Sequence, residues 1–218
     1  MISPHLRHWK RAALALGVTA AAIILCPVVA DDWNRDEGDH RMEVTSTTFT
    51  AGSTLPLSAI DNIPEDGVNA CSVNGAPGGD ESPQLAWSHV PHNTRSFVVI
   101  LYDPTAAFTH WGMYNISAHT RMLPQNAGVA DSRFGRQVDN DFGDPHYDGP
   151  CPPMNVAPFA HHYVFTVYAL DTELSLPSSA NFPANAETLY HALIRAGRDG
   201  HILASASIGA FYSSTPAD

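Results

Sequence analysis

Four side chains that could bind a small anion stand where predicted strands begin or end. Asp103 closes the apolar run SFVVILYD, and His110 opens HWGMYNIS. His161 and Tyr163 open HHYVFTVYALD and share one face of that strand, because side chains repeat every two residues, whereas His162 points the other way. Imidazole and phenol groups donate hydrogen bonds to anions. The pattern predicts a polar pocket at a rim where loops meet strands.

Other interpretations of these residues remain open. Each could merely end a strand at the surface, or the two histidines and Asp103 could bind a metal, although their scattered spacing matches no metal motif. G-x-S-x-G, phosphate-loop and H-E-x-x-H motifs do not occur in the sequence. DNDFGD (139–144) matches a calcium loop only in part, because Pro150 stands where such a loop needs Glu, so we interpret it as a solvated turn. We predict no metal, no cofactor and no enzymatic activity.

The loop HYDGPCPP (146–153) comes shortly before the strand of His161 and Tyr163. Its prolines fix φ, so the loop should hold its shape without a ligand and lose little entropy on binding. Gly149 is expected to let the backbone come close to a ligand. The loop should therefore form one wall of the pocket.

The hydrophobic pattern predicts one mainly β domain over residues 42–213, followed by a tail at 214–218. Alternating or continuous apolar runs predict strands at 42–50, 84–90, 96–103, 110–117, 161–171 and 201–212. The stretches 51–83 and 118–160 are rich in Gly, Pro, Asn and Asp and are expected to be long loops.

One helix is expected late in the chain, over residues 184–198. Asn185 or Asn181 could cap its start, and Gly197 could end it. Apolar residues at helical spacing on its inner face are Ala186, Leu189, Leu193 and Ile194.

The first thirty residues are typical of a secretory signal peptide ending at Ala30. Three basic residues precede a long uncharged apolar run, and a polar, disordered leader is expected over 31–41. The alternative is an uncleaved membrane anchor. Cleavage would place the protein in the periplasm or outside the cell. It would also change the formal net charge from −11 to −14, because residues 1–30 contain three basic residues and no acidic one. So acidic a protein is not expected to bind nucleic acid.

Two cysteines, Cys71 and Cys151, remain after cleavage removes Cys26. A pair of cysteines in an exported protein predicts a disulfide, and two free buried thiols are the alternative.

These segments together resemble the phosphatidylethanolamine-binding protein (PEBP) family, in the bacterial branch often labelled Raf-kinase-inhibitor-like. SPQLAW (82–87) is similar to the family's S-P-x-L-x-W segment, and VVILYDPTA followed by THW is similar to D-P-D-x-P and its histidine–aromatic pair. DFGDPHYDGPCPP, HHYVFTVYALD and HILASASIGAFY are similar to the glycine–proline loop, the H-x-Y strand and the closing segment. The resemblance covers about 43–212. Thr105 and Ala107 depart from it, because they replace the second acid and the last proline of D-P-D-x-P.

The resemblance implies antiparallel β-sheets with a pocket that binds phosphate or a phosphorylated head group without turnover. The alternatives are a protein-interaction inhibitor of a kinase or protease, and a weak hydrolase that uses Asp103 and His110 as an acid–base pair. In the family fold the 51–83 segment would pass the mouth of the pocket, where Cys71 could meet Cys151. The pocket residues that the family motifs imply are Asp103, His110, Gly149, Cys151, Pro152, His161 and Tyr163.

Overall fold

A computed structural model describes residues 41–216 of the protein. The strands are β1 (Glu43–Thr45), β2 (Pro64–Glu65), β3 (Val68–Asn69), β4 (Leu85–Ser88), β5 (Ser96–Asp103), β6 (Phe108–Ser117), β7 (Met122–Leu123), β8 (Arg136–Gln137), β9 (His161–Leu170) and β10 (Ile202–Tyr212). The helix α1 spans Ala186–Arg198, and the 3-10 turns η1 and η2 span Leu57–Ala59 and Val73–Gly75. The prediction of a mainly antiparallel β fold with a late helix is confirmed.

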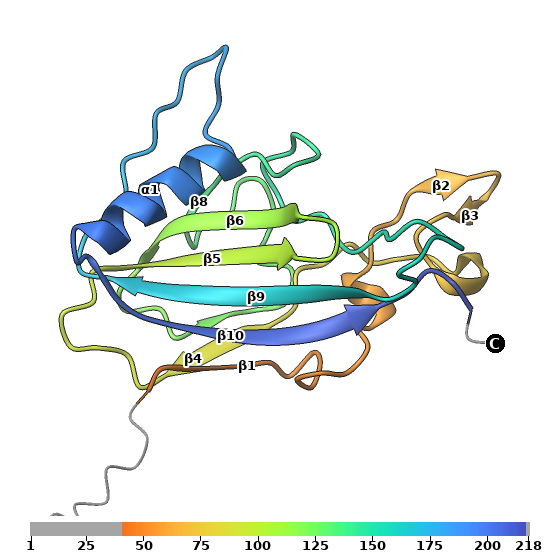
Figure 1. Ribbon diagram of the computed structural model, residues 1–218, viewed down its shortest axis with the longest axis horizontal. Coiled ribbons are helices and arrows are strands. Elements are labelled where there is room, and N and C mark those ends of the chain that lie inside the picture. Colours follow the sequence, from red (N-terminus) through yellow and green to blue (C-terminus); the bar gives the residue numbers. More distant parts are fainter. Residues whose placement is uncertain (1–40, 217–218) are drawn as a thin grey trace, which may run out of the picture. The chain divides into compact units, whose positions relative to one another are not determined.

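The central sheet has the strand order β10-β9-β5-β6-β8 (Figure 1). Its strands are antiparallel, so the last residues of β5 lie beside the first residues of both neighbours. Tyr102 pairs with Val164 of β9, and Asp103 pairs with Phe108 of β6. The register thus brings side chains from distant parts of the sequence to one rim of the sheet.

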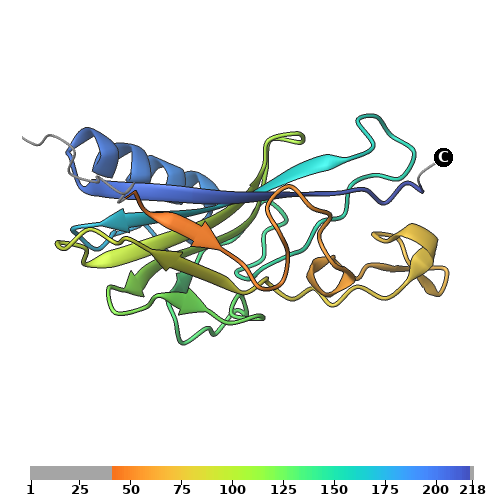
Figure 2. The ribbon, with the colours of Figure 1, turned by 90° about the horizontal axis from the view of Figure 1, so that it is seen from below.

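Both faces of this sheet are covered, which explains the continuous apolar run of β5. Phe97, Val99 and Leu101 pack in the larger core, which includes residues of the small sheet β1-β4-β7. Val98 and Ile100 point the other way and pack in a second core with residues of α1. Figure 2 shows α1 and the small sheet on opposite sides of the central sheet. A strand that is buried on both faces is apolar at successive positions and does not alternate with polar residues.

The helix α1 has the predicted N-cap. The Asn185 side chain accepts a hydrogen bond from the Thr188 backbone N–H at 3.0 Å, and the Thr188 hydroxyl accepts one from the Asn185 backbone N–H at 2.9 Å. Two expectations were wrong. Gly197 lies inside the helix, and Gly200 beyond it adopts the left-handed conformation that ends such helices. Ile194 is 63% exposed rather than part of the buried face.

Several segments differ from the sequence expectations. The first strand covers three residues rather than 42–50, because the chain after Thr45 turns and its Thr47 backbone N–H donates to the Gln84 side chain. The stretch 118–160 contains the short strands β7 and β8, and 51–83 contains a small hairpin, β2–β3. In residues 41–216 no helix has the length and apolar character needed to cross a membrane. The predicted signal peptide, and all of the leader except residue 41, lie outside the described residues.

Candidate functional site

A small pocket of about 200 Å³ lies at the rim of the central sheet where β5 ends and β6 and β9 begin. Its walls come from the β5–β6 turn, the 139–144 turn, the proline loop and the three strands. The lining residues are Asp103, Ala106, Phe108, His110, Phe142, Cys151, Pro152, Pro153, His161 and Tyr163. Six of the seven residues implied by the sequence are therefore brought together here, and Gly149 is not among them.

A carboxylate–imidazole pair forms the most deeply buried polar part of the pocket. His161 Nδ1 donates to Asp103 Oδ2 at 2.6 Å, and Asp103 is 1% exposed. The other carboxylate oxygen, Oδ1, accepts from the backbone N–H groups of Thr105 at 2.7 Å and Ala106 at 3.2 Å. Both carboxylate oxygens thus accept hydrogen bonds from the protein. Its bond to Nδ1 leaves Nε2 as the ring nitrogen of His161 that is free for a ligand.

His110 does not pair with Asp103. Its Nδ1 donates to the Asp148 carbonyl oxygen at 3.0 Å, and its ring packs against Phe108, Phe142 and Tyr163 with ring centroids 4.9, 5.9 and 5.3 Å away. Burial among these rings lowers the pKa of His110 to about 4. The imidazole is therefore neutral near pH 7, and its Nε2 carries a lone pair rather than a proton.

Tyr163 follows His161 on the same face of β9, as the alternation predicted. Its side chain is 1% exposed, and burial, together with the charge of Asp103, raises the pKa of its phenol. The hydroxyl therefore keeps its proton and serves as a donor. His162 lies on the opposite face, where its ring stacks on Phe211 with centroids 4.7 Å apart.

A wider hollow of about 510 Å³ lies beside α1, but its chemistry differs. Its charged residues Glu187, His191 and Arg195 are all exposed. Solvent screens exposed charges, so they contribute little to the binding of a small ion. In the small pocket, by contrast, the polar residues Asp103, His110 and His161 are buried.

Comparison with known proteins agrees with the sequence resemblance. The family model for phosphatidylethanolamine-binding protein matches residues 45–213. The chain belongs to this family. It is 40% identical over 147 residues to the Escherichia coli UPF0098 protein YbhB, an alignment covering 64% of this chain and 85% of that protein. It is 43% identical over 147 residues to E. coli YbcL, with 64% and 73% covered.

Solved structures of PEBP relatives have the same fold. The crystal structure of E. coli YbcL, described as a new member of the mammalian PEBP family, matches with a TM-score of 0.63 and 33% identity, covering 79% of this chain and 98% of that one. The structure of the PEBP homologue CT736 from Chlamydia trachomatis matches with a TM-score of 0.57 and 29% identity, covering 80% and 98%.

The departure from the PEBP D-P-D-x-P motif has a structural counterpart in the β5–β6 turn. Ala107 adopts a φ of 53°, a left-handed conformation that proline cannot reach because its ring fixes φ near −65°. Thr105, which replaces the second acid, accepts a hydrogen bond from the His162 backbone N–H at 3.0 Å through its hydroxyl. A neutral hydroxyl thus connects the turn to the start of β9, and the turn has one carboxylate fewer than the motif.

The proline loop is held from outside by several backbone contacts. The Gly149 N–H donates to the Asp80 side chain at 2.8 Å, and the Asp61 N–H donates to the Pro150 carbonyl oxygen at 3.3 Å. A β-carbon at Gly149 would overlap the Ala59 carbonyl oxygen. Gly149 thus lets the proline loop pack closely against the backbone near Ala59, and its expected contact with a ligand stays a prediction.

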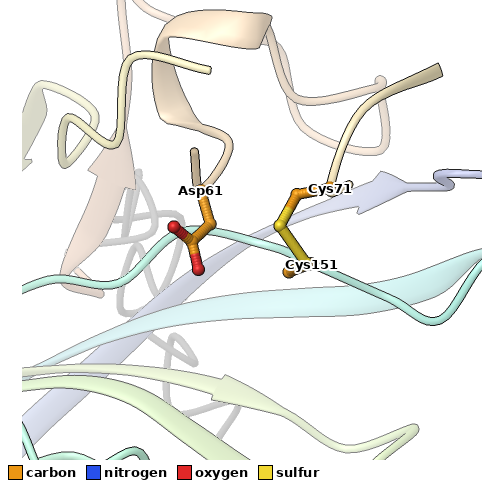
Figure 3. A group of neighbouring side chains, drawn as sticks. All are labelled: Asp61, Cys71 and Cys151. Carbon is orange, nitrogen blue, oxygen red and sulfur yellow. A yellow bond between two sulfur atoms is a disulfide. The ribbon is translucent and has the colours of Figure 1, made fainter. Parts of the chain in front are cut away.

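A disulfide joins Cys71 and Cys151, as predicted. Figure 3 shows the bond beside Asp61, with Cys71 coming from the 51–83 segment and Cys151 from the proline loop. Cys71 is fully buried, whereas Cys151 lines the pocket. Burial and the nearby charge of Asp80 raise the pKa of Asp61 to about 6. The outer side of the proline loop thus lies beside the disulfide and the carboxyl group of Asp61, which is easily protonated.

Two groups of side chains near this loop have the spacing of metal ligands. Ligand atoms lie within 4.8 Å of one another in the group Asp144, His146 and Asp148, and in the group Asp61, Cys71 and Cys151. The second group is not a metal site while its sulfurs form the disulfide. In the first group His146 Nδ1 lies 3.4 Å from Asp148 Oδ1, and none of its three residues lines the pocket.

The sequence analysis missed the aromatic and turn residues of the pocket wall. DNDFGD is a turn whose residues 141–144 are exposed, as interpreted from the sequence, but Asn140 is only 4% exposed, and its Oδ1 accepts from the backbone N–H groups of Phe142, Gly143 and Asp144. That turn presents Phe142 to the pocket. Phe108 had a signal in the sequence, since it precedes His110 by two residues at the start of the same strand.

Proposed function

We propose that this PEBP-family protein is exported and binds a small anion, phosphate or a phosphorylated head group, in the pocket without converting it. The observation that carries the proposal is the Asp103–His161 pair in a cavity of about 200 Å³ that Tyr163 also lines. A cavity of that size is smaller than the roughly 300–1,000 Å³ of drug-sized ligand sites, so it suits a head group rather than a whole lipid.

The charge of the pocket is compatible with an anion despite the acidic chain. Asp103 accepts three hydrogen bonds, from Thr105, Ala106 and His161, so its charge is compensated by donors on both oxygens. A protonated His161 would offer Nε2–H to the ligand. Tyr163, which lines the same pocket, would supply its hydroxyl as a second donor.

Export is supported by the disulfide. Disulfides persist in oxidising compartments and are rare in reducing ones. The Cys71–Cys151 bond is therefore what a periplasmic or secreted protein would carry. The signal-peptide prediction for residues 1–30 supports the same compartment.

A second candidate function, a weak hydrolase, is favoured by the geometry of the same pair. An aspartate that fixes His161 through Nδ1 is the arrangement by which hydrolases orient a general base. The acid–base pair would then be Asp103–His161 rather than Asp103–His110. Among the described residues that line the pocket there is no serine, and Cys151 is held in a disulfide, so water would have to be the nucleophile.

The binding proposal predicts that His161→Ala weakens phosphate binding by about 1–3 kcal/mol, the range for losing a charge-assisted hydrogen bond. His162→Ala, on the opposite face of β9, should change the affinity little. Isothermal titration calorimetry of the exported protein with phosphate and phosphorylethanolamine measures both. Tyr163→Phe, which removes one hydroxyl, gives an independent test if His161→Ala folds poorly.

The same preparations separate a binding protein from an enzyme. Saturable binding with no release of product from phosphate and carboxylate esters supports the binding proposal. Turnover that His161→Ala abolishes would establish the hydrolase instead. Equal losses for His161→Ala and His162→Ala would contradict the placement of the ligand on the inner face of β9.

A further inference from the structure

The two histidines of the pocket have different hydrogen-bonding characters. His110 Nδ1 is committed to a backbone carbonyl, which accepts but cannot donate, so this nitrogen must carry the proton. The other nitrogen of the neutral ring is then an acceptor. His161 Nδ1 is committed to a carboxylate in the same way, so its Nε2 carries a proton only when the ring is doubly protonated.

The surroundings of His110 favour the neutral ring. Three aromatic rings, of Phe108, Phe142 and Tyr163, pack against it and exclude water. The carboxylates that act on it are Asp103 at the end of β5 and Asp141 in the 139–144 turn, and they favour the cation. Asp141 is partly compensated, because it accepts from the Thr109 backbone N–H at 2.6 Å. The desolvation outweighs both charges and depresses the pKa of His110.

We propose that the pocket selects an anion that brings its own proton: inorganic phosphate as the monoanion, or a phosphomonoester in its singly ionised form. The ligand's P–OH would donate to His110 Nε2, while its other oxygens accept from Tyr163 and protonated His161. This inference rests on the proposed anion-binding function and narrows its ligand class.

The same arrangement disfavours two other kinds of anion. A phosphodiester, the linkage of phospholipid head groups, has no P–OH and would place an anionic or ester oxygen against the lone pair of His110. Two acceptors facing each other without a proton leave a buried polar group unsatisfied. A dianion would also bring a second, uncompensated negative charge close to the Asp103 carboxylate. Specificity would thus arise because the wrong ligand leaves the acceptor nitrogen of His110 without a hydrogen-bond donor.

Methyl phosphate and dimethyl phosphate test this directly, because they differ in the P–OH and by one methyl group. At about pH 5.5 the monoester is mostly the monoanion, since phosphomonoesters have a second pKa of about 6. We expect calorimetry to show methyl phosphate binding about tenfold more tightly than the diester, the effect of one unsatisfied polar group.

The dependence on pH supplies a second measurement. Between about pH 5.5 and 7.5 the monoanion fraction of a phosphomonoester falls about twentyfold, whereas dimethyl phosphate keeps its charge. The affinity ratio between the two esters should therefore fall as pH rises, even where both affinities fall.

The variant His110→Gln links the preference to this residue. A glutamine amide can present either its oxygen or its NH₂ group, so the preference should shrink to within about threefold. Diester binding at least as tight as in the wild type shows that the variant's pocket is intact. If the wild type binds both esters equally, the inference fails while the binding function stands. Binding of neither ester would overturn the proposed function itself.

Discussion

Removing the disulfide should lower the free energy of unfolding by about 4 kcal/mol, because the chain-entropy model assigns this value to a closed loop of about 80 residues. Cys71 and Cys151 are separated by 80 positions, so the bond restricts much of the unfolded chain. For a domain of this size the loss corresponds to roughly a 10 °C decrease in Tm. The variant Cys71→Ala/Cys151→Ala avoids burying a new hydroxyl group at the fully buried position 71.

The disulfide should also affect ligand binding, since it connects the 51–83 segment to a pocket wall. Without it the proline loop keeps the bonds of Gly149 to Asp80 and of Pro150 to Asp61, so it should loosen rather than detach. Phosphate affinity should fall together with Tm. Dithiothreitol should reproduce both changes in the wild type and change neither in the double variant. Two alkylatable thiols in the unreduced exported protein would contradict the prediction.

Strands with strong local patterns could be predicted from the sequence, and strands that depend on tertiary pairing could not. The run 96–103 has few alternatives to a buried strand, and Asn185 marks the helix start through its side chain. The strands β7 and β8 have two residues each and exist because β4 and β6 supply their partners. A pattern of two residues carries no periodicity.

The candidate site was predictable to a similar degree. His161 and Tyr163 share a face by simple alternation, and the motif placed Asp103 near them. The partner of His110 was not predictable, because the acceptor is a backbone carbonyl 38 positions away and every residue has one. The roles of two histidines that look equivalent in the sequence are set by these acceptors.

Asp103 is the residue whose loss should be most damaging to the pocket. Its carboxylate accepts from two backbone N–H groups and from His161, and it is 1% exposed. Asp103→Ala would leave the buried His161 donor and the two partly buried N–H groups of the β5–β6 turn without this acceptor. An unsatisfied buried polar group costs about 1–3 kcal/mol, so we expect a loss of about 3 kcal/mol. Urea unfolding of the exported protein measures this loss, and phosphate binding should be lost with it.

Asp103→Asn should behave differently, because asparagine keeps one acceptor oxygen. That oxygen can still accept from Thr105 and Ala106, which leaves the NH₂ group facing His161 Nδ1. A donor at this position favours the neutral tautomer with the proton on Nε2, which then points toward the ligand. The variant should therefore lose only about 1 kcal/mol of stability, the net value of one hydrogen bond.

The change of His161 tautomer in Asp103→Asn should change how ligand affinity depends on pH. In the wild type, Nε2 of His161 donates only when the ring is protonated, so affinity for dimethyl phosphate should be higher at about pH 6 than at about pH 8. In Asp103→Asn the neutral ring already donates, so the affinity should stay nearly constant between about pH 6 and 8. The diester is the suitable probe because its charge does not change over this range. If Asp103→Asn shows the same pH dependence as the wild type, the proton on Nε2 does not control binding. If Asp103→Asn unfolds as readily as Asp103→Ala, the negative charge of Asp103 matters more for stability than its acceptor geometry.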